Sequence, residues 1–176
     1  MSPPSTTDLH DAVGAAVPGS NPPGGQETPS STAEALVEAA LGLFAERGYD
    51  GTSVRAITEG AGANIAAVTY HFGSKQALFE AVLETILLPV GREIREASQG
   101  PGSPLDRIRG VVAALLRHMG RNPAYPRLML QQLSTQDLPH PVVQRTIRQG
   151  LGMLQGLVEE GQRDGTIRPG DSTLMA

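Results

Sequence analysis

The stretch that decides the fold is AGANIAAVTYHFGSKQAL, from Ala61 to Leu78. Its small residues and glycines predict a tight turn, after which a short helix is expected over residues 65–71, with Asn64 at its N-cap. The Phe72-Gly73 pair predicts a break, and Ser74 is placed to begin another helix. No pattern in this stretch is typical of bond-making chemistry. It therefore predicts a short helix that is presented for contact with another molecule.

A longer helix is expected before this stretch. Ser31 and Glu34 have the spacing of a capping box, in which a hydroxyl and a carboxylate bond the backbone N–H groups at a helix start. Apolar residues then recur at helical spacing as far as Gly48, which suits the position just after a helix end. The pattern predicts a helix over residues 33–47.

A second short helix is expected over residues 54–61, where Thr52 or Ser53 can act as its N-cap. Two short helices joined by a turn and braced by a longer one form a helix-turn-helix, whose second member lies in the DNA major groove. The segment therefore predicts a DNA-binding unit.

Residues 33–88 resemble the DNA-binding domain of the TetR family of bacterial transcriptional regulators. The matching segments are AALGLFAERGYDGTSV, RAITEGAGA, NIAAVTYHF and GSKQALFEAVL. The resemblance implies an all-α protein with a helix-turn-helix domain over residues 31–76 and a helical effector-binding and dimerisation domain over residues 77–176. It also implies a repressor that binds a palindromic double-stranded DNA operator as a homodimer and is released by a small-molecule effector.

The resemblance also implies which side chains meet DNA. The phosphate-contacting set is Thr52, Thr69, Tyr70, His71 and Lys75, and the groove-facing set is Asn64, Ile65, Ala66 and Ala67. Asn64 can hydrogen-bond a base or a phosphate, whereas Ile65 and the alanines offer only apolar contact. Tyr70 either contacts phosphate or packs between helices, and His71 either contacts phosphate or caps its own helix. Phe72 and Phe79 are expected in the core.

Charge gives this DNA contact little support. The 176-residue chain has 14 Lys and Arg against 18 Asp and Glu. Between residues 33 and 88 there are seven acids and three bases, the bases being Arg47, Arg55 and Lys75. Many family members have a basic residue at the position of Ile65 and an aromatic hydroxyl at that of Thr69. Binding is therefore expected to depend on Lys75, the only lysine, and on the helix N-terminus at Ser74.

The rest of the chain also reads as helical. A long helix is expected over residues 76–95, bent or broken near Pro89, and it would join the DNA-binding domain to the body. Further helices are expected over residues 105–121, 127–133 and 142–162. Three glycines of the last helix, Gly150, Gly152 and Gly156, do not fit a nucleotide-binding loop and predict close helix packing.

An effector pocket is expected among these C-terminal helices, because bundle cores hold ligands between facing helices. Its candidate lining residues are Met119, Tyr125, Met129, Leu133, Met153 and Leu157. Taken singly, each of them is expected more often as an ordinary core residue than as a pocket residue. These residues name no ligand class.

Several function classes find no support in the sequence. There is no cysteine, no apolar run long enough to cross a bilayer and no basic secretory leader, so a cytoplasmic protein is expected. No catalytic motif, metal-ligand spacing or cofactor motif occurs. Residues 1–30 are rich in Pro, Gly, Ser and Thr and hold no base, which predicts a passive disordered tail.

Two alternatives stay open. Family members dimerise through two further C-terminal helices, so the chain is either truncated near Ala176 or dimerises differently. A helical protein-interaction module that has lost DNA binding is the alternative function. Salt-dependent binding to a palindromic site distinguishes it from a repressor.

Overall fold

The computed structural model describes residues 29–134 and 138–170, and these ranges form α-helices without any strand. The prediction of an all-α protein is confirmed. Residues 1–28 of the expected tail lie outside the described residues, whereas residues 29 and 30, also assigned to the tail, are the start of the first helix. The helices of the described ranges are α1 (Pro29–Arg47), α2 (Val54–Gly60), α3 (Ala67–Phe72), α4 (Lys75–Ser98), α5 (Pro104–Arg121), α6 (Ala124–Ser134) and α7 (Pro141–Asp164).

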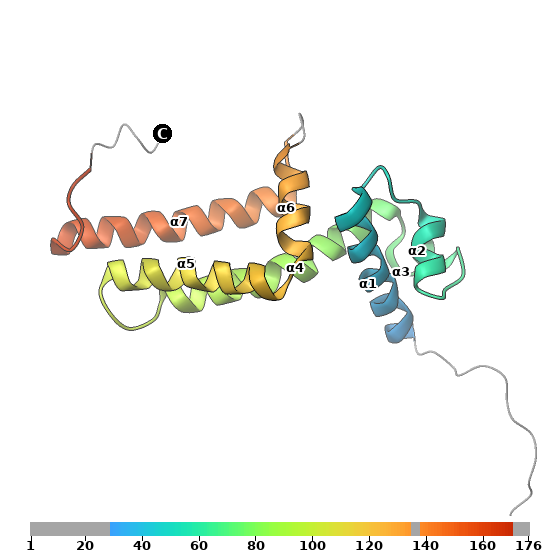
Figure 1. Cartoon of the computed structure of the whole chain (residues 1–176), viewed down its shortest axis with the longest axis horizontal. Coiled ribbons are helices and arrows are strands. Elements are labelled where there is room, and N and C mark those ends of the chain that lie inside the picture. The colour runs from blue at the N-terminus through green and yellow to red at the C-terminus, as the bar shows by residue number, and fades with distance from the viewer. Residues whose placement is uncertain (1–28, 135–137, 171–176) are drawn as a thin grey trace, which may run out of the picture.

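The molecule is elongated, with α1 to α3 gathered at one end, here called the head (Figure 1). Helices α5, α6 and α7 form the body together with the far part of α4, which runs between the two parts (Figure 1). Within residues 29–134 and 138–170, no helix is both long and apolar enough to cross a membrane.

Helix α1 starts earlier than expected. It begins at Pro29, so Ser31 and Glu34 lie inside the helix, and the predicted capping box at its start is wrong. Proline is suited to the first helical position because its fixed φ matches the helix and its missing N–H would have no intrahelical partner there. The end of α1 agrees with the prediction, since Gly48 has a φ of 74° and its N–H donates to the Phe44 carbonyl at 2.9 Å.

The core of the head follows from the apolar spacing of α1. Leu36, Ala40 and Phe44 recur every fourth residue, so they share one face, and all three are fully buried. Ile57 of α2 and Val68 of α3 close this core from the other side.

An aromatic group joins the head to the start of α4. The Phe44 and Phe79 rings meet edge to face at 4.9 Å, and the Tyr49 ring lies 5.0 Å from that of Phe79. Edge-to-face rings add stability beyond the apolar area that they bury. Phe79 is therefore in the core as predicted, whereas Phe72 is only half-buried against it.

Helix α4 is continuous through Pro89, so the predicted break does not occur. Proline removes one backbone hydrogen bond, to the carbonyl of Thr85 four residues earlier. Both residues are exposed, so water can solvate that carbonyl. The opposite face of α4 is apolar throughout, and its buried residues include Leu78, Phe79, Val82, Leu83, Ile86, Leu87 and Val90.

The body is a packed set of α4, α5 and α7, with α6 lying across it (Figure 1). Helix α6 also contacts α1 of the head, where the Gln131 side-chain amide donates to the Ala45 carbonyl at 3.2 Å. Leu128 of α6 and Val143 of α7 are fully buried in the same apolar cluster as the α1 residues. One continuous core thus connects head and body.

A charged cluster fastens α5 to α4. The Glu93 carboxylate accepts hydrogen bonds from Arg121 at 2.8 and 2.9 Å and lies 3.5 Å from Nδ1 of His118. His118 is only 2% exposed, and its ring lies edge-on to Tyr125 with 5.1 Å between centroids. Burial raises the pKa of the Tyr125 phenol.

The predicted close packing at three α7 glycines is wrong within this chain. A Cβ placed on Gly150, Gly152 or Gly156 would meet nothing within 4 Å. The tight contact lies instead at Gly161, where a Cβ would come within 2.6 Å of Ile167. The chain after α7 folds back there, and the Ile167 N–H donates to the Gly161 carbonyl at 2.8 Å.

Candidate nucleic-acid interface

The N-terminus of α2 is capped by the serine that precedes it. The Ser53 hydroxyl accepts a hydrogen bond from the Ala56 N–H at 3.1 Å, so Ser53 is the N-cap, not Thr52. Helix α2 ends at Gly60, and Gly62 turns the chain with a φ of 65°, which a residue with a side chain rarely adopts. The chain therefore reaches α3 after a tight turn, as a helix-turn-helix requires.

Asn64 organises the approach to α3. Its side-chain oxygen accepts from the Ala66 N–H at 2.9 Å, and its carbonyl accepts from the Ala67 N–H at 2.8 Å. This turn delays the regular helix, which begins at Ala67 and not at Ile65 as predicted, so its N-cap is Ala66 and the prediction of Asn64 as N-cap is wrong. Because its oxygen is engaged, the exposed Asn64 side chain presents its NH₂ group, which can donate to a base acceptor or a phosphate.

Helix α3 is anchored by one residue and otherwise presented outward. Val68 is 1% exposed and packs in the head core, whereas Tyr70 is 80% exposed. Tyr70 thus does not pack between helices, although its ring lies edge-on to His71 at 4.9 Å. The other exposed predicted residues are Asn64, Ile65, Ala66 and Thr69, while Ala67 and His71 are half-buried. The structure brings these predicted residues together in one short segment.

Thr52 stands apart from the other predicted contacts. It is 1% exposed, and its hydroxyl lies 2.8 Å from the Gly48 carbonyl and 3.2 Å from the Leu43 carbonyl. Its single hydroxyl hydrogen is therefore used within the head, where it ties the end of α1 to the start of α2. Its predicted phosphate contact stays a prediction.

The start of α4 adds the one cation of the segment. Ser74 is the N-cap, and its hydroxyl accepts from the Ala77 N–H at 3.1 Å. Lys75 follows, with its ammonium nitrogen 4.1 Å from the centroid of the Tyr49 ring. This distance is typical of a cation–π contact.

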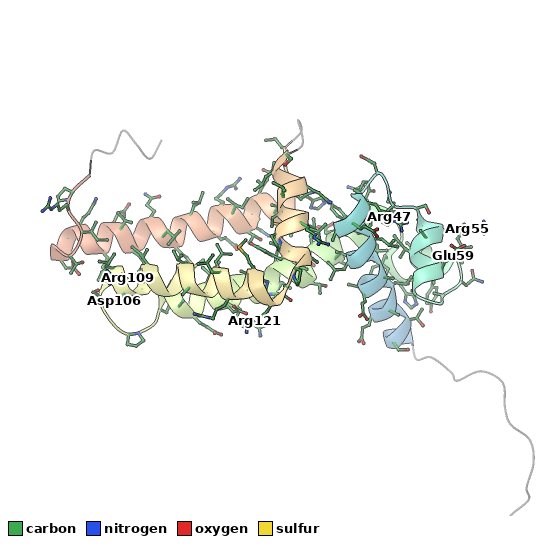
Figure 2. The ribbon with its side chains drawn as sticks, in the orientation of Figure 1. Arg47, Arg55, Glu59, Asp106, Arg109 and Arg121 are labelled. Carbon is green, nitrogen blue, oxygen red and sulfur yellow. The ribbon has the colours of Figure 1, made fainter. Side chains whose placement is uncertain are left out.

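The other two bases of the head are paired with acids. The Arg55 guanidinium lies 2.8 Å from the Glu59 carboxylate one turn on, and Arg47 lies 3.6 Å from Glu46. Figure 2 shows Arg55 and Glu59 together on α2, at the outer end of the head. Among the bases of residues 29–75, Lys75 is thus the one without an ion pair. It is the cation most available to a phosphate.

Comparison with known proteins agrees with this geometry. Residues 36–82, from α1 into α4, match the family described as bacterial regulatory proteins of the tetR family. Two curated relatives are the transcriptional repressors NicS of Pseudomonas putida, 26% identical over 78% of this chain, and KstR2 of Mycobacterium tuberculosis, 28% identical over 76%. The head and the start of α4 thus match the TetR family. The matches span 66% of NicS and 68% of KstR2, about two thirds of each relative.

Solved structures show that the likeness extends through the body. A putative fatty acid metabolism regulator of Clostridium perfringens has a TM-score of 0.70 at 21% identity, covering 80% of this chain and 77% of that protein. The Bacillus subtilis regulator FadR, solved with stearoyl-CoA, has a TM-score of 0.65 at 19% identity, covering 80% and 77%. At identities this low, the structural similarity shows a shared fold and nothing more. The relatives named are transcriptional regulators and not enzymes, and they support a DNA-binding regulator.

Sequence reasoning missed one residue of this TetR-family interface. The sequence around Tyr49 indicates only a turn, yet the Tyr49 ring lies beneath the Lys75 ammonium group. The two residues are far apart in the sequence, so no local spacing could have paired them. The one signal in the sequence is the tyrosine itself, because a large aromatic ring next to a glycine turn usually packs against another side chain.

Of the six predicted effector-pocket residues, one lines a cleft described here. Met153 lines a shallow cleft of about 380 Å³ between α4 and α7, together with Arg95, Gln149 and Gly152. The other five lie outside the lining of this cleft. Leu157 is buried, Leu133 is exposed, and Met119, Tyr125 and Met129 are half-buried. Their role in binding an effector stays a prediction.

Proposed function

We propose that this TetR-family protein is a repressor that binds a palindromic operator as a homodimer and releases it when a small-molecule effector binds the body. The observation that carries the DNA-binding part is the exposed segment from Asn64 to Tyr70, backed by the Lys75 cation at the start of α4. The named relatives, which are transcriptional repressors, support the sign of regulation.

The proposed division of labour places DNA contact in residues 31–76 and effector binding and dimerisation in residues 77–176. Helix α4 runs from one part to the other, so a change in its tilt would alter the spacing of two heads in a dimer (Figure 1). An effector that favours the wrong spacing would lower operator affinity by population shift. The structure of FadR with stearoyl-CoA supports a body that can hold a ligand in this fold.

The test is selection of bound fragments from random DNA, with sedimentation to fix the oligomeric state. We expect a palindromic consensus, a dimer, and affinity that falls steeply with salt, because each neutralised phosphate contributes about −0.9 to the logarithmic salt slope. A monomer without DNA affinity would overturn the proposal and favour a protein-interaction module.

Tyr70 gives the proposal a matched pair of variants. Tyr70→Ala should weaken operator binding about equally on all sequences, because a phosphate contact carries no sequence information. Tyr70→Phe removes only the hydroxyl, so it separates the contribution of the hydroxyl to operator binding from that of the ring. Neither variant should lower the melting temperature, because the side chain is 80% exposed. Unchanged DNA binding by Tyr70→Ala would remove Tyr70 from the interface.

A further inference from the structure

A cleft between α4 and α7 gathers positive charge in a chain that carries more acids than bases. Its volume is about 230 Å³, and its lining includes Arg92 and Arg95 from α4 and Arg145 from α7. Glu84 is the only acid in this lining. Three bases to one acid is the reverse of the balance in the whole chain, which has 14 bases and 18 acids.

Two of these guanidinium groups have no partner within the described ranges. Neither Arg92 nor Arg95 makes an ion pair or a side-chain hydrogen bond there, whereas Arg145 lies 3.6 Å from the Glu84 carboxylate. The side-chain amide of Gln149, also in the lining, makes no hydrogen bond to a described residue. Arginine is suited to bidentate recognition of carboxylate and phosphate groups, so this lining offers donors to an anion.

The floor of the cleft is apolar. Leu87 and Val142 are 4% and 3% exposed and lie at its base, and Leu88 stands at its edge with 66% exposure. Gly91 also lines the cleft and borders open space, since a Cβ placed there would meet nothing within 4 Å. Leu87, Leu88 and Val142 are the apolar side chains of a lining that otherwise holds charged and polar groups, so the cleft offers a small apolar surface beside its cations.

We propose that this cleft binds an amphipathic organic anion, a small molecule with a carboxylate or phosphate on a short apolar part. The apolar part would lie over Leu87 and Val142 and fill the space above Gly91. The anionic group would meet Arg92 and Arg95 and compete with Glu84 for Arg145. The inference rests on the proposed function, because it gives the chemical class and the place of the effector.

The position of the cleft explains how such a ligand would act. It joins α4 to α7, and the α4 residues that line it are continuous with the helix that begins at Lys75 in the head (Figure 1). Releasing Arg145 from Glu84 and bridging the two helices through the ligand would change how α4 lies on α7. The head would move with the helix.

Calorimetric titration with octanoate tests the proposal, and two further probes separate its parts. Octanoate should bind, while 1-octanol, with the same chain and no charge, should bind at least about tenfold more weakly, as the loss of a charge-assisted hydrogen bond implies. Inorganic phosphate alone should also bind more weakly than octanoate. Equal binding of 1-octanol would overturn the role of the arginines, and equal binding of phosphate would overturn the role of the floor.

Variants of the cleft give opposite expected changes. Arg95→Gln and Arg92→Gln should each weaken octanoate binding about tenfold, whereas Glu84→Gln should tighten it by removing the competing carboxylate. Arg117→Gln is the matched control, because Arg117 is exposed on α5 and lies outside the cleft lining. Equal effects of Arg117→Gln and Arg95→Gln would show attraction by net charge alone and would overturn the site.

Gly91→Leu tests the location directly. Its side chain would occupy the open space of the cleft, so octanoate binding should be lost while the melting temperature is kept, with Gly120→Leu on α5 as the control. Binding that survives in Gly91→Leu would place the ligand elsewhere and contradict the proposal. A gel shift without octanoate reports DNA binding separately, so failure of the cleft is distinguishable from failure of the proposed repressor.

Discussion

The ammonium nitrogen of Lys75 lies 4.1 Å from the centroid of the Tyr49 ring, which links the first residue of α4 to the turn after α1. The ring is itself held against Phe44 and Phe79 in the core. The only lysine of the chain is thus positioned by an aromatic wall while its charge stays free of any carboxylate in the described residues.

Lys75→Met keeps the apolar stem and removes the charge. We expect weaker operator binding on all sequences and a salt slope reduced by about one, because one phosphate would no longer be neutralised. The cation–π contact is worth about 0.5–1 kcal/mol at exposed sites, so the free energy of unfolding should fall only slightly. Gel shifts over a salt series measure the slope, with Lys75→Arg as the control that keeps the charge. An unchanged slope would exclude Lys75 from phosphate binding.

The role of Asn64 in the turn before α3 can be separated from its predicted DNA contact. Asn64→Asp keeps an oxygen to accept from the Ala66 N–H but replaces the exposed NH₂ donor with negative charge. We expect near-native stability and a large loss of DNA affinity. Asn64→Ala loses the hydrogen bond of the turn as well, which typically costs about 1 kcal/mol, and should alter sequence preference. Equal DNA affinity of Asn64→Asp and the native protein would rule out the donor role.

Thr52→Val should act on stability. The substitution keeps the shape and removes the hydroxyl, so the partly buried Gly48 carbonyl loses its donor at a cost of about 1 kcal/mol. Denaturant unfolding measures this loss, and Thr52→Ser, which keeps the hydroxyl, should lose less. At a temperature where both variants are folded, DNA affinity should be close to native. A selective loss of DNA affinity in Thr52→Val would instead support the predicted phosphate contact.

The capping box of α5 should make stability depend on pH in the acid range. The Ser103 hydroxyl donates to the Asp106 carboxylate at 2.6 Å and, with the Ser103 N–H and Arg109, lowers the pKa of Asp106. Because the folded pKa is lowered, the contribution to stability is present above the ordinary pKa of about 4 and is lost as pH falls through the lowered value.

Ser103→Ala should therefore raise the pKa of Asp106 toward its ordinary value, which NMR titration of the carboxyl group measures. The stability difference between native protein and Ser103→Ala should be largest near neutral pH and should shrink in acid below the lowered pKa. A difference that stays constant with pH would mean that the serine stabilises α5 without acting on the carboxylate.

Local patterns carried much of the fold prediction. The apolar stripe of α1 and the turn glycines at Gly48 and Gly62 are local features, and each appears where the sequence placed it. The misplaced features depend on surroundings that a local pattern does not contain. Pro89 is a helix breaker by its local chemistry, but it lies on the solvent face of a helix held by its buried side. Ser31 fits a capping box, yet α1 extends past it to Pro29.

For the candidate site, the sequence predicted a segment but not the side-chain contacts around it. The segment from Asn64 to His71 could be identified because its amino-acid sequence resembles that of the TetR family. The burial of Thr52 and the contact of Lys75 with Tyr49 depend on side chains brought together by the fold. The arginine-lined cleft was missed for the same reason, since Arg92 and Arg145 face a common space only after α4 and α7 pack.

Helix α4 contributes Leu78 and Phe79 to the packing of the head and Leu87 and Val90 to that of the body, within one uninterrupted apolar cluster. The two parts should consequently melt in a single cooperative transition. A fragment cut at residue 76 would lack a wall of its own core. Substitutions of buried body residues can then reduce the fraction of operator DNA that is bound, because they shorten the lifetime of the folded head.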